Sequence, residues 1–191
     1  MTVIGSRRAR TRERLQSAAL ELFEAQGYDA TTVSQIAASA DVTEMTFFRH
    51  FAAKERVIVD DPYDPLLGEA VAAQTRDLPP VRRAVAGFRE ALAALPDDDT
   101  FLRRKVRIVA RTPSLRPAVV GSTRETEDVV AQALLEGGAS GLEARIAAAA
   151  LLAGLTAALL AWAETEQGSL REALRVAMDV LEACDTGARH A

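Results

Sequence analysis

The sequence predicts an all-α protein, in which an N-terminal three-helix helix-turn-helix domain is followed by a larger helical domain. Three observations predict this class. Apolar residues recur at intervals of three and four along most of the chain, alanine accounts for 38 of its 191 residues, and no segment has the two-residue alternation of a strand. Since alanine has the highest helix propensity, composition and periodicity agree.

Four helices are expected in the N-terminal part. Gly27 ends the first, Thr32 and Gln35 have the spacing of a capping box at the start of the second, and Thr43 caps the third. The fourth follows after a short break. Their expected ranges are 9–26, 32–40, 43–51 and 53–60.

Two prolines mark the domain boundary. Pro62 and Pro65 cannot lie inside a continuous helix, so the fourth helix must break and resume near residue 64. We therefore predict domains over residues 1–58 and 59–191. The later helices, separated by proline-rich or glycine-rich loops, are expected at residues 80–95, 98–111, 113–136, 142–166 and 170–183.

The formal net charge of −4 argues against a non-specific binder of polyanions. It is unevenly divided. Residues 1–58 hold 8 basic and 7 acidic residues, for +1, and residues 59–191 hold 15 and 20, for −5. A specific nucleic-acid site in the N-terminal domain is therefore compatible with the charge.

Several classes of site have no support in the sequence. One cysteine, Cys184, and two histidines, His50 and His190, give neither a disulfide framework nor metal-ligand spacing. No phosphate-binding glycine loop or catalytic constellation is present. We therefore expect no catalytic residue, no metal and no cofactor, and no enzymatic activity. The first residues lack the apolar run of a signal peptide, so a cytoplasmic protein is expected.

Residues 146–163 form an uncharged run of eighteen residues. The length approaches that of a transmembrane helix. Much of the run is alanine, however, and Arg145 and Glu164 border it closely. We expect no membrane span but a helix buried on all sides, in a bundle core or a subunit interface.

The stretch from Thr31 to Phe51 indicates a helix-turn-helix. Two short capped helices joined by a turn of about three residues cross steeply and leave the second helix exposed. The major groove of DNA, about 12 Å wide, admits one such helix. On the residues alone, the alternative is a pair of core helices in an all-α bundle.

About 50 N-terminal residues, from Arg10 to Ile58, resemble the TetR family of transcriptional regulators. The matching positions are Gly27-Tyr28, Thr31-Thr32, Ile36-Ala37, Ala40, Val42-Thr43, Thr46, Phe51 and Lys54. Asp41 departs from the family by replacing a turn glycine, and Met45 by replacing a small residue. Phe48 replaces a tyrosine whose hydroxyl typically meets a phosphate in the family.

The resemblance implies a sequence-specific DNA-binding regulator. We expect a homodimeric repressor that binds a palindromic double-stranded operator and is released by a small-molecule effector. The alternative is a helical protein-interaction module that uses its helix-turn-helix for partner helices.

The residues expected to contact DNA share the N-terminal domain. The resemblance assigns Thr32, His50 and Lys54 to phosphates. Arg49 suits guanine, Met45 and Thr46 suit a thymine methyl group, and Glu44 suits cytosine. The full set is Arg7, Arg8, Arg10, Thr32, Thr43, Glu44, Met45, Thr46, Phe48, Arg49, His50 and Lys54.

A basic segment precedes the first predicted helix. Residues 7–14 hold five arginines and one glutamate, which gives +4. Such an arm can follow phosphates or enter a minor groove, or it can be a disordered solubilising tail.

The resemblance also implies that the last two helices form a four-helix bundle with a second subunit. Small residues at four-residue spacing let another helix approach closely. The expected interface residues are Ala150, Gly154, Ala158, Leu174, Met178 and Leu181.

In the family, the middle helices surround an effector pocket. The candidates here are Phe88, Leu92, Phe101, Arg104, Arg107, Arg111, Leu155 and Trp162. Apolar residues at helical spacing are more often core than pocket. Arg104, Arg107 and Arg111 share one stripe of their helix. If this stripe faces inward, we expect an anionic effector; if it faces outward, we expect the arginines to be a solvated surface. A hydrophobic effector is the other alternative.

Overall fold

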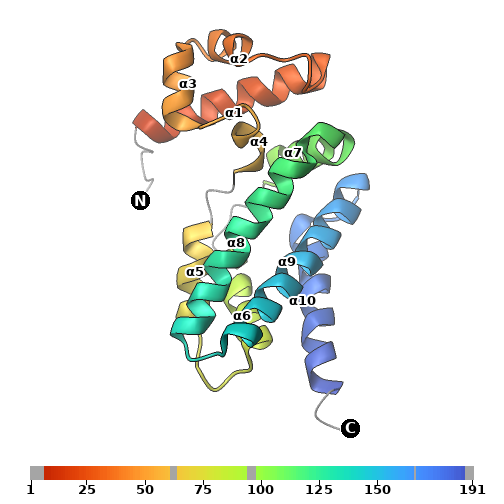
Figure 1. The fold of residues 1–191 in the computed structure, drawn as a ribbon. Helices are drawn as coiled ribbons and strands as arrows, with labels where there is room; N and C mark the ends of the chain where they lie inside the picture. The colour runs from red at the N-terminus through yellow and green to blue at the C-terminus, as the bar shows by residue number, and fades with distance from the viewer. Residues whose placement is uncertain (1–6, 61–63, 94–97, 166, 188–191) are drawn as a thin grey trace. The chain divides into compact units, whose positions relative to one another are not determined.

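The computed structural model describes residues 7–60, 64–93, 98–165 and 167–187 (Figure 1). Within these ranges the chain forms ten α-helices, one 3₁₀ turn and no strand, which confirms the predicted class. The chain divides into two structural units, one of residues 1–60 and 107–119 and one of residues 61–106 and 120–191. The domain boundary predicted between residues 58 and 59 stays a prediction. Pro62, one of the two prolines on which it rests, lies outside the described ranges.

The first unit contains the helix-turn-helix. Its helices are α1 (Arg7–Gln26), α2 (Val33–Ser39), α3 (Glu44–His50) and α4 (Arg56–Val59). They pack around a core that contains Leu15, Phe23, Ile36, Phe47 and Phe51, all buried. Phe47 and Phe51 are therefore core residues, as their four-residue spacing predicts.

A distant segment completes this core. Leu115, in the 3₁₀ turn Pro113–Leu115, is fully buried among the helix-turn-helix residues. The preceding residue, Ser114, donates a hydrogen bond from Oγ to Asp29 Oδ1 at 2.7 Å. Residues 107–119 therefore belong to the first unit, although more than forty residues separate them from α4.

The helix ends follow from local chemistry. Gln35 Oε1 accepts from the N–H of Thr32 at 2.9 Å while Thr32 Oγ1 accepts from the N–H of Gln35 at 3.2 Å, which confirms the capping box. Gly27 follows α1 with φ of +86°. Asp41, in the turn between α2 and α3, adopts φ of +53°. This left-handed conformation is one that aspartate tolerates better than most residues, so the turn survives without glycine.

The helix α1 begins at Arg7, two residues before its predicted start, so residues 7–14 lie in the helix and the prediction that they form an arm before it is wrong; the DNA contacts expected for Arg7, Arg8 and Arg10 stay a prediction. These residues include neither glycine nor proline, and arginine and alanine are good helix formers. Charge alone indicated an arm, whereas propensity extends the helix through it. The fourth predicted helix is also shorter than expected, because α4 covers only residues 56–59.

The second unit is a helical bundle. Its helices are α5 (Asp64–Ala72), α6 (Pro80–Ala93), α7 (Thr100–Arg111), α8 (Arg116–Glu136), α9 (Gly141–Glu164) and α10 (Leu170–Gly187), with the end of α7 and the start of α8 counted in the first unit. The tightest packing joins α9 to α10 and α5 to α6 (Figure 1). The core of this bundle contains Val71, Val85, Val130, Leu134 and Leu151, all fully buried.

Arg103 holds the turn between α9 and α10. Its guanidinium lies 4.1 Å from the centroid of the Trp162 ring and donates to the carbonyls of Thr165 at 2.6 Å and Gly168 at 2.8 Å. Asp99 Oδ2 accepts from the N–H of Leu170 at 3.0 Å, at the start of α10. The start of α7 therefore supplies partners for backbone groups that the two helix ends leave free.

Among the described residues, α9 is the one helix long and apolar enough to cross a membrane. A third of its most apolar window is buried inside this chain, and a single such helix is weak support for a membrane protein. Its Ser140 side chain accepts from the N–H of Glu143, as in a capping box. Because only part of its surface is buried, α9 has one face in the bundle core and another face exposed to solvent.

The α5–α6 contact depends on Gly87. A Cβ atom added to this glycine would lie 2.6 Å from Cα of Val71 and 2.7 Å from its backbone nitrogen. We expect Gly87→Ala to lower the free energy of unfolding by about 1–3 kcal/mol through overpacking. Gly121→Ala is the matched control, because it is also helical and has nothing within 4 Å. It should be neutral or stabilise by up to about 1 kcal/mol. Equal midpoints of urea unfolding in the two variants would contradict the close approach.

Candidate nucleic-acid interface

The short helix α3 has one buried and one exposed face. Phe47 is fully buried, whereas Met45 is 69% exposed and Phe48 is 52% exposed. Glu44 and Arg49 are also exposed, and Thr46 and His50 are partly buried. The structure therefore brings together on one helix the residues expected to face base edges.

Thr43 and Thr46 are engaged with each other. Thr43 Oγ1 accepts from the N–H of Thr46 at 3.2 Å, and the two hydroxyls are hydrogen-bonded at 3.0 Å. Thr43 is the N-cap of α3, as predicted. The Thr43 hydroxyl thus caps α3, and the Thr46 hydroxyl is bonded to it.

Arg12 of α1 holds the C-terminal end of α3. Its Nη1 donates to the carbonyl of His50 at 3.0 Å, and its Nη2 pairs with Asp60 Oδ2 at 3.1 Å. The guanidinium also lies 4.2 Å from the centroid of the Phe51 ring. A cation at a helix C-terminus interacts favourably with the helix dipole.

Arg14 does the same for α2. Its Nη2 donates to the carbonyl of Ala40, the C-cap residue of α2, and lies 3.7 Å from Asp41 Oδ2. Two arginines counted in the predicted arm are therefore structural. No signal in the linear sequence identified them, because their partners lie 26 to 48 positions away.

Lys54 also has partners inside the unit. Its Nζ donates to the carbonyls of Tyr28 and Thr31, each at 2.9 Å, and lies 4.0 Å from the centroid of the Tyr28 ring. Burial, with the nearby charges of Glu55 and Asp29, raises the pKa of Tyr28 to about 12. Lys54 thus fixes the turn that leads into α2, and the phosphate contact expected for it stays a prediction.

The remaining predicted phosphate contacts lie at the surface. Arg7, Arg8 and Arg10 are exposed on the first turns of α1, and Thr32 is exposed at the start of α2. His50 is partly buried, and burial together with the charges of Arg8 and Arg12 lowers its pKa below the usual value. A neutral His50 can still donate one hydrogen bond to a phosphate.

Comparisons with known proteins agree with this geometry. Residues 15–59 match the family model of bacterial regulatory proteins of the tetR family, and residues 78–185 match that of the MftR C-terminal domain. The second match covers more than half of the chain. The chain belongs to the TetR family of transcriptional regulators. The predicted family and DNA-binding function are confirmed, and the partner-helix alternative is not favoured.

Two named relatives are similar in sequence. TcmR of Streptomyces glaucescens, an HTH-type transcriptional regulator, is 36% identical over 131 residues, which cover 64% of this chain and 58% of TcmR. MftR of Mycobacterium tuberculosis, named for regulation of mycofactocin biosynthesis, is 28% identical over 191 residues, which cover 94% of this chain and 93% of MftR.

Solved structures share the fold. SmeT, the repressor of the Stenotrophomonas maltophilia efflux pump SmeDEF, is 26% identical with a TM-score of 0.59, over 91% of this chain and 89% of SmeT. Thermus thermophilus FadR in complex with lauroyl-CoA is 23% identical with a TM-score of 0.51, over 89% of this chain and 92% of FadR. At that identity, the FadR likeness concerns the fold alone.

Proteins of this TetR family are soluble cytoplasmic regulators and generally not enzymes.

The predicted effector residues fall into three groups. Leu92, Leu155 and Trp162 are buried in the core of the second unit, and Phe88 packs against it. Phe101 is exposed. The arginine stripe is divided, because Arg104 lies in the second unit whereas Arg107 and Arg111 lie in the first. The pocket assignment therefore stays a prediction.

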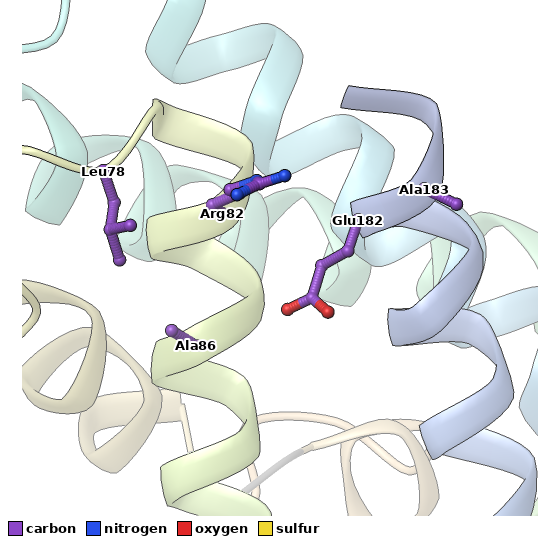
Figure 2. A pocket seen from close by; sticks show the side chains of 5 residues that line it. All are labelled: Leu78, Arg82, Ala86, Glu182 and Ala183. Carbon is purple, nitrogen blue, oxygen red and sulfur yellow. The ribbon is translucent and has the colours of Figure 1, made fainter. Parts of the chain in front are cut away.

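Two cavities in the second unit have other linings. One of about 390 Å³ is lined by Leu78, by Arg82 and Ala86 of α6, and by Glu182 and Ala183 of α10 (Figure 2). Figure 2 shows the side chains of Arg82 and Glu182 extending into the space between the two helices. The other, of about 240 Å³, lies between α8 and α9 and is lined by Arg124, Glu127, Asp128, Ala131, Arg145, Ile146, Ala148 and Ala149.

The predicted interface residues lie between helices of the same chain. A Cβ atom on Gly154 would meet Leu181 Cδ1 at 3.2 Å, and Leu174 and Met178 are buried. Ala158 packs against the same core, and Ala150 is partly buried. The small residues do allow a close approach, but the helix that approaches is α10 of this chain.

Lys54→Ala tests the structural role of this lysine. We expect the free energy of unfolding to fall by about 1.5–3 kcal/mol, because two carbonyls lose a charged donor. Arg49→Ala, at an exposed position, should leave stability within about 0.5 kcal/mol. Chemical unfolding followed by circular dichroism measures both. An unchanged stability for Lys54→Ala would show that its contacts in the first unit contribute little.

Proposed function

We propose that the protein is a homodimeric transcriptional repressor. In this proposal, two copies of α3 enter successive major grooves of a palindromic operator, and a small-molecule effector bound by the second unit releases the DNA. The observation that carries the proposal is the exposed face of α3 on a helix whose other face and C-terminal end are held by buried contacts. A recognition helix needs this combination of a free face and a fixed orientation.

Membership of the family supports binding to operator DNA, and the names of relatives support repression rather than activation of transcription. SmeT is described as a repressor, and TcmR is an HTH-type regulator. Ligand complexes of neighbours, SmeT with triclosan and FadR with lauroyl-CoA, support a small-molecule effector. One of these compounds is hydrophobic and the other carries anionic groups, so both predicted effector classes stay open.

The dimer interface that we propose uses the outward face of α9 and α10. Large apolar residues are exposed there, namely Leu142, Ile146, Leu160, Val176 and Val180. On α9, exposed alanines fill the same stripe at positions 149, 153 and 157. The spacing 142, 146, 149, 153, 157 and 160 follows one face of a helix. A second copy of this face would remove these side chains from water, as two-fold symmetry allows.

The proposed interface is tested by charge. Ile146→Lys should shift the protein from dimer to monomer, because a lysine in the middle of an apolar contact would lose its hydration. Leu66→Lys, at an exposed leucine of α5 that is 50% accessible, is the matched control and should stay dimeric. Analytical ultracentrifugation across a concentration series measures the shift. A variant Ile146→Lys that dimerises like the unchanged chain would place the interface elsewhere.

Operator binding tests the function itself. Fragments of the host genome that bind the full chain should share a palindrome, and the logarithm of the association constant should fall linearly with the logarithm of salt concentration, by about 0.9 per phosphate neutralised. Arg49→Ala should weaken binding by about 1–3 kcal/mol if the guanidinium reads guanine. Failure to enrich any duplex would favour the protein-interaction alternative.

A further inference from the structure

We propose that α3 reads thymine through its C5-methyl group, with Met45 and Phe48 as the residues that determine this specificity. The inference rests on the proposed function, because it names the base that the same interface selects. It predicts thymine at the operator positions that these two side chains face.

The two side chains form one apolar surface. Met45 and Phe48 are three residues apart, a spacing that places them on the same side of α3. Met45 is 69% exposed and Phe48 is 52% exposed. The helix α3 has seven residues, so these two large apolar side chains make up much of its exposed face. Large apolar side chains at neighbouring exposed positions indicate a contact surface more often than an isolated one does.

Few groups on this face are available for hydrogen bonds to bases. The hydroxyls of Thr43 and Thr46 bond each other, so one of the two O–H groups is used within the unit and one can still donate. The exposed side chains of α3 that can form hydrogen bonds are those of Glu44 and Arg49, at the two sides of the apolar pair. The central part of the exposed face can therefore recognise shape and apolar groups, whereas hydrogen bonding is confined to its borders.

The Phe48 ring is held in place. It meets the ring of Phe47 edge to face, with centroids 5.5 Å apart and planes at 83°. Phe47 is fully buried, so this contact anchors Phe48 to the core of the unit. Such an arrangement limits the conformational freedom that the side chain loses on binding. Phe48 has no hydroxyl, so it cannot donate a hydrogen bond to a phosphate.

The major groove offers one apolar group to such a surface. Thymine presents a methyl group at C5 beside its O4 acceptor, whereas adenine, guanine and cytosine present donors and acceptors but no methyl group. Opposite Met45 and Phe48, any other base would lose water from a polar edge without a replacement partner. The chemistry of the face therefore favours thymine.

Uracil provides a direct test, because it differs from thymine only by this methyl group. The full chain would be used to select duplexes from a library with a randomised 24-base-pair centre, and the recovered operator would be synthesised with each thymine replaced in turn by deoxyuridine. At one or two positions per half-site we expect affinity to fall about fourfold, as for one buried methyl. Symmetric replacement in both half-sites should give about fifteenfold. Other thymines should change affinity less than twofold.

Protein variants assign the effect to these residues. Met45→Ala and Phe48→Ala should each lose the thymine-to-uracil difference at its own position, while Arg49→Ala should bind more weakly but keep the ratio unchanged. Circular dichroism confirms that each variant is folded. Equal binding of the thymine and uracil operators, or the same ratio in all variants, would overturn the inference while DNA binding stands. A library from which no duplex is enriched would instead refute the proposed function.

Discussion

Two guanidinium groups of α1 hold the helices that carry the proposed DNA-contacting face. Helices shorter than about 12 residues are marginal in isolation, so neither α2 nor α3, with seven residues each, can form or keep its direction unaided. Arg12 binds the carbonyl at the end of α3, and Arg14 binds the carbonyl at the end of α2. The exposed face of α3 is then what remains after Phe47 has been buried beneath it. The recognition surface thus depends on contacts that do not touch DNA.

The helix caps and the buried phenylalanines were predictable because each depends on neighbours within four residues. The roles of Arg12, Arg14 and Lys54 were not, since their partners are 23 to 48 residues away and become neighbours only in the folded unit. The same limit explains the misplaced arm. A count of charges in residues 7–14 describes electrostatics, but it does not show that two of the five arginines donate to backbone carbonyls of neighbouring helices.

The helix α9 shows a different limit of periodicity. Its composition is apolar all round, so the sequence predicted a helix with two covered faces. The spacing of Gly154 predicted a close helix–helix approach, which the structure has, but with α10 of the same chain. Periodicity identifies a face that can be buried, yet it does not say which burial occurs within the chain and which between copies. Leu142 and Ile146 are exposed in the folded chain, so burial within this chain does not account for their apolar character.

Leu115 has a consequence for protein engineering. Because this residue completes the core around α1 and α4, the DNA-binding unit is assembled from two separate stretches of chain. Chimeric regulators are often conceived as a single cut after the recognition module and a fusion to a foreign sensor. Here such a cut would leave a hole where Leu115 sits and would remove the Ser114 partner of Asp29. A chimera that keeps the first unit intact has to include residues 107–119 together with residues 1–60. Otherwise the C-terminal domain fused to it must provide a side chain that fills the position of Leu115.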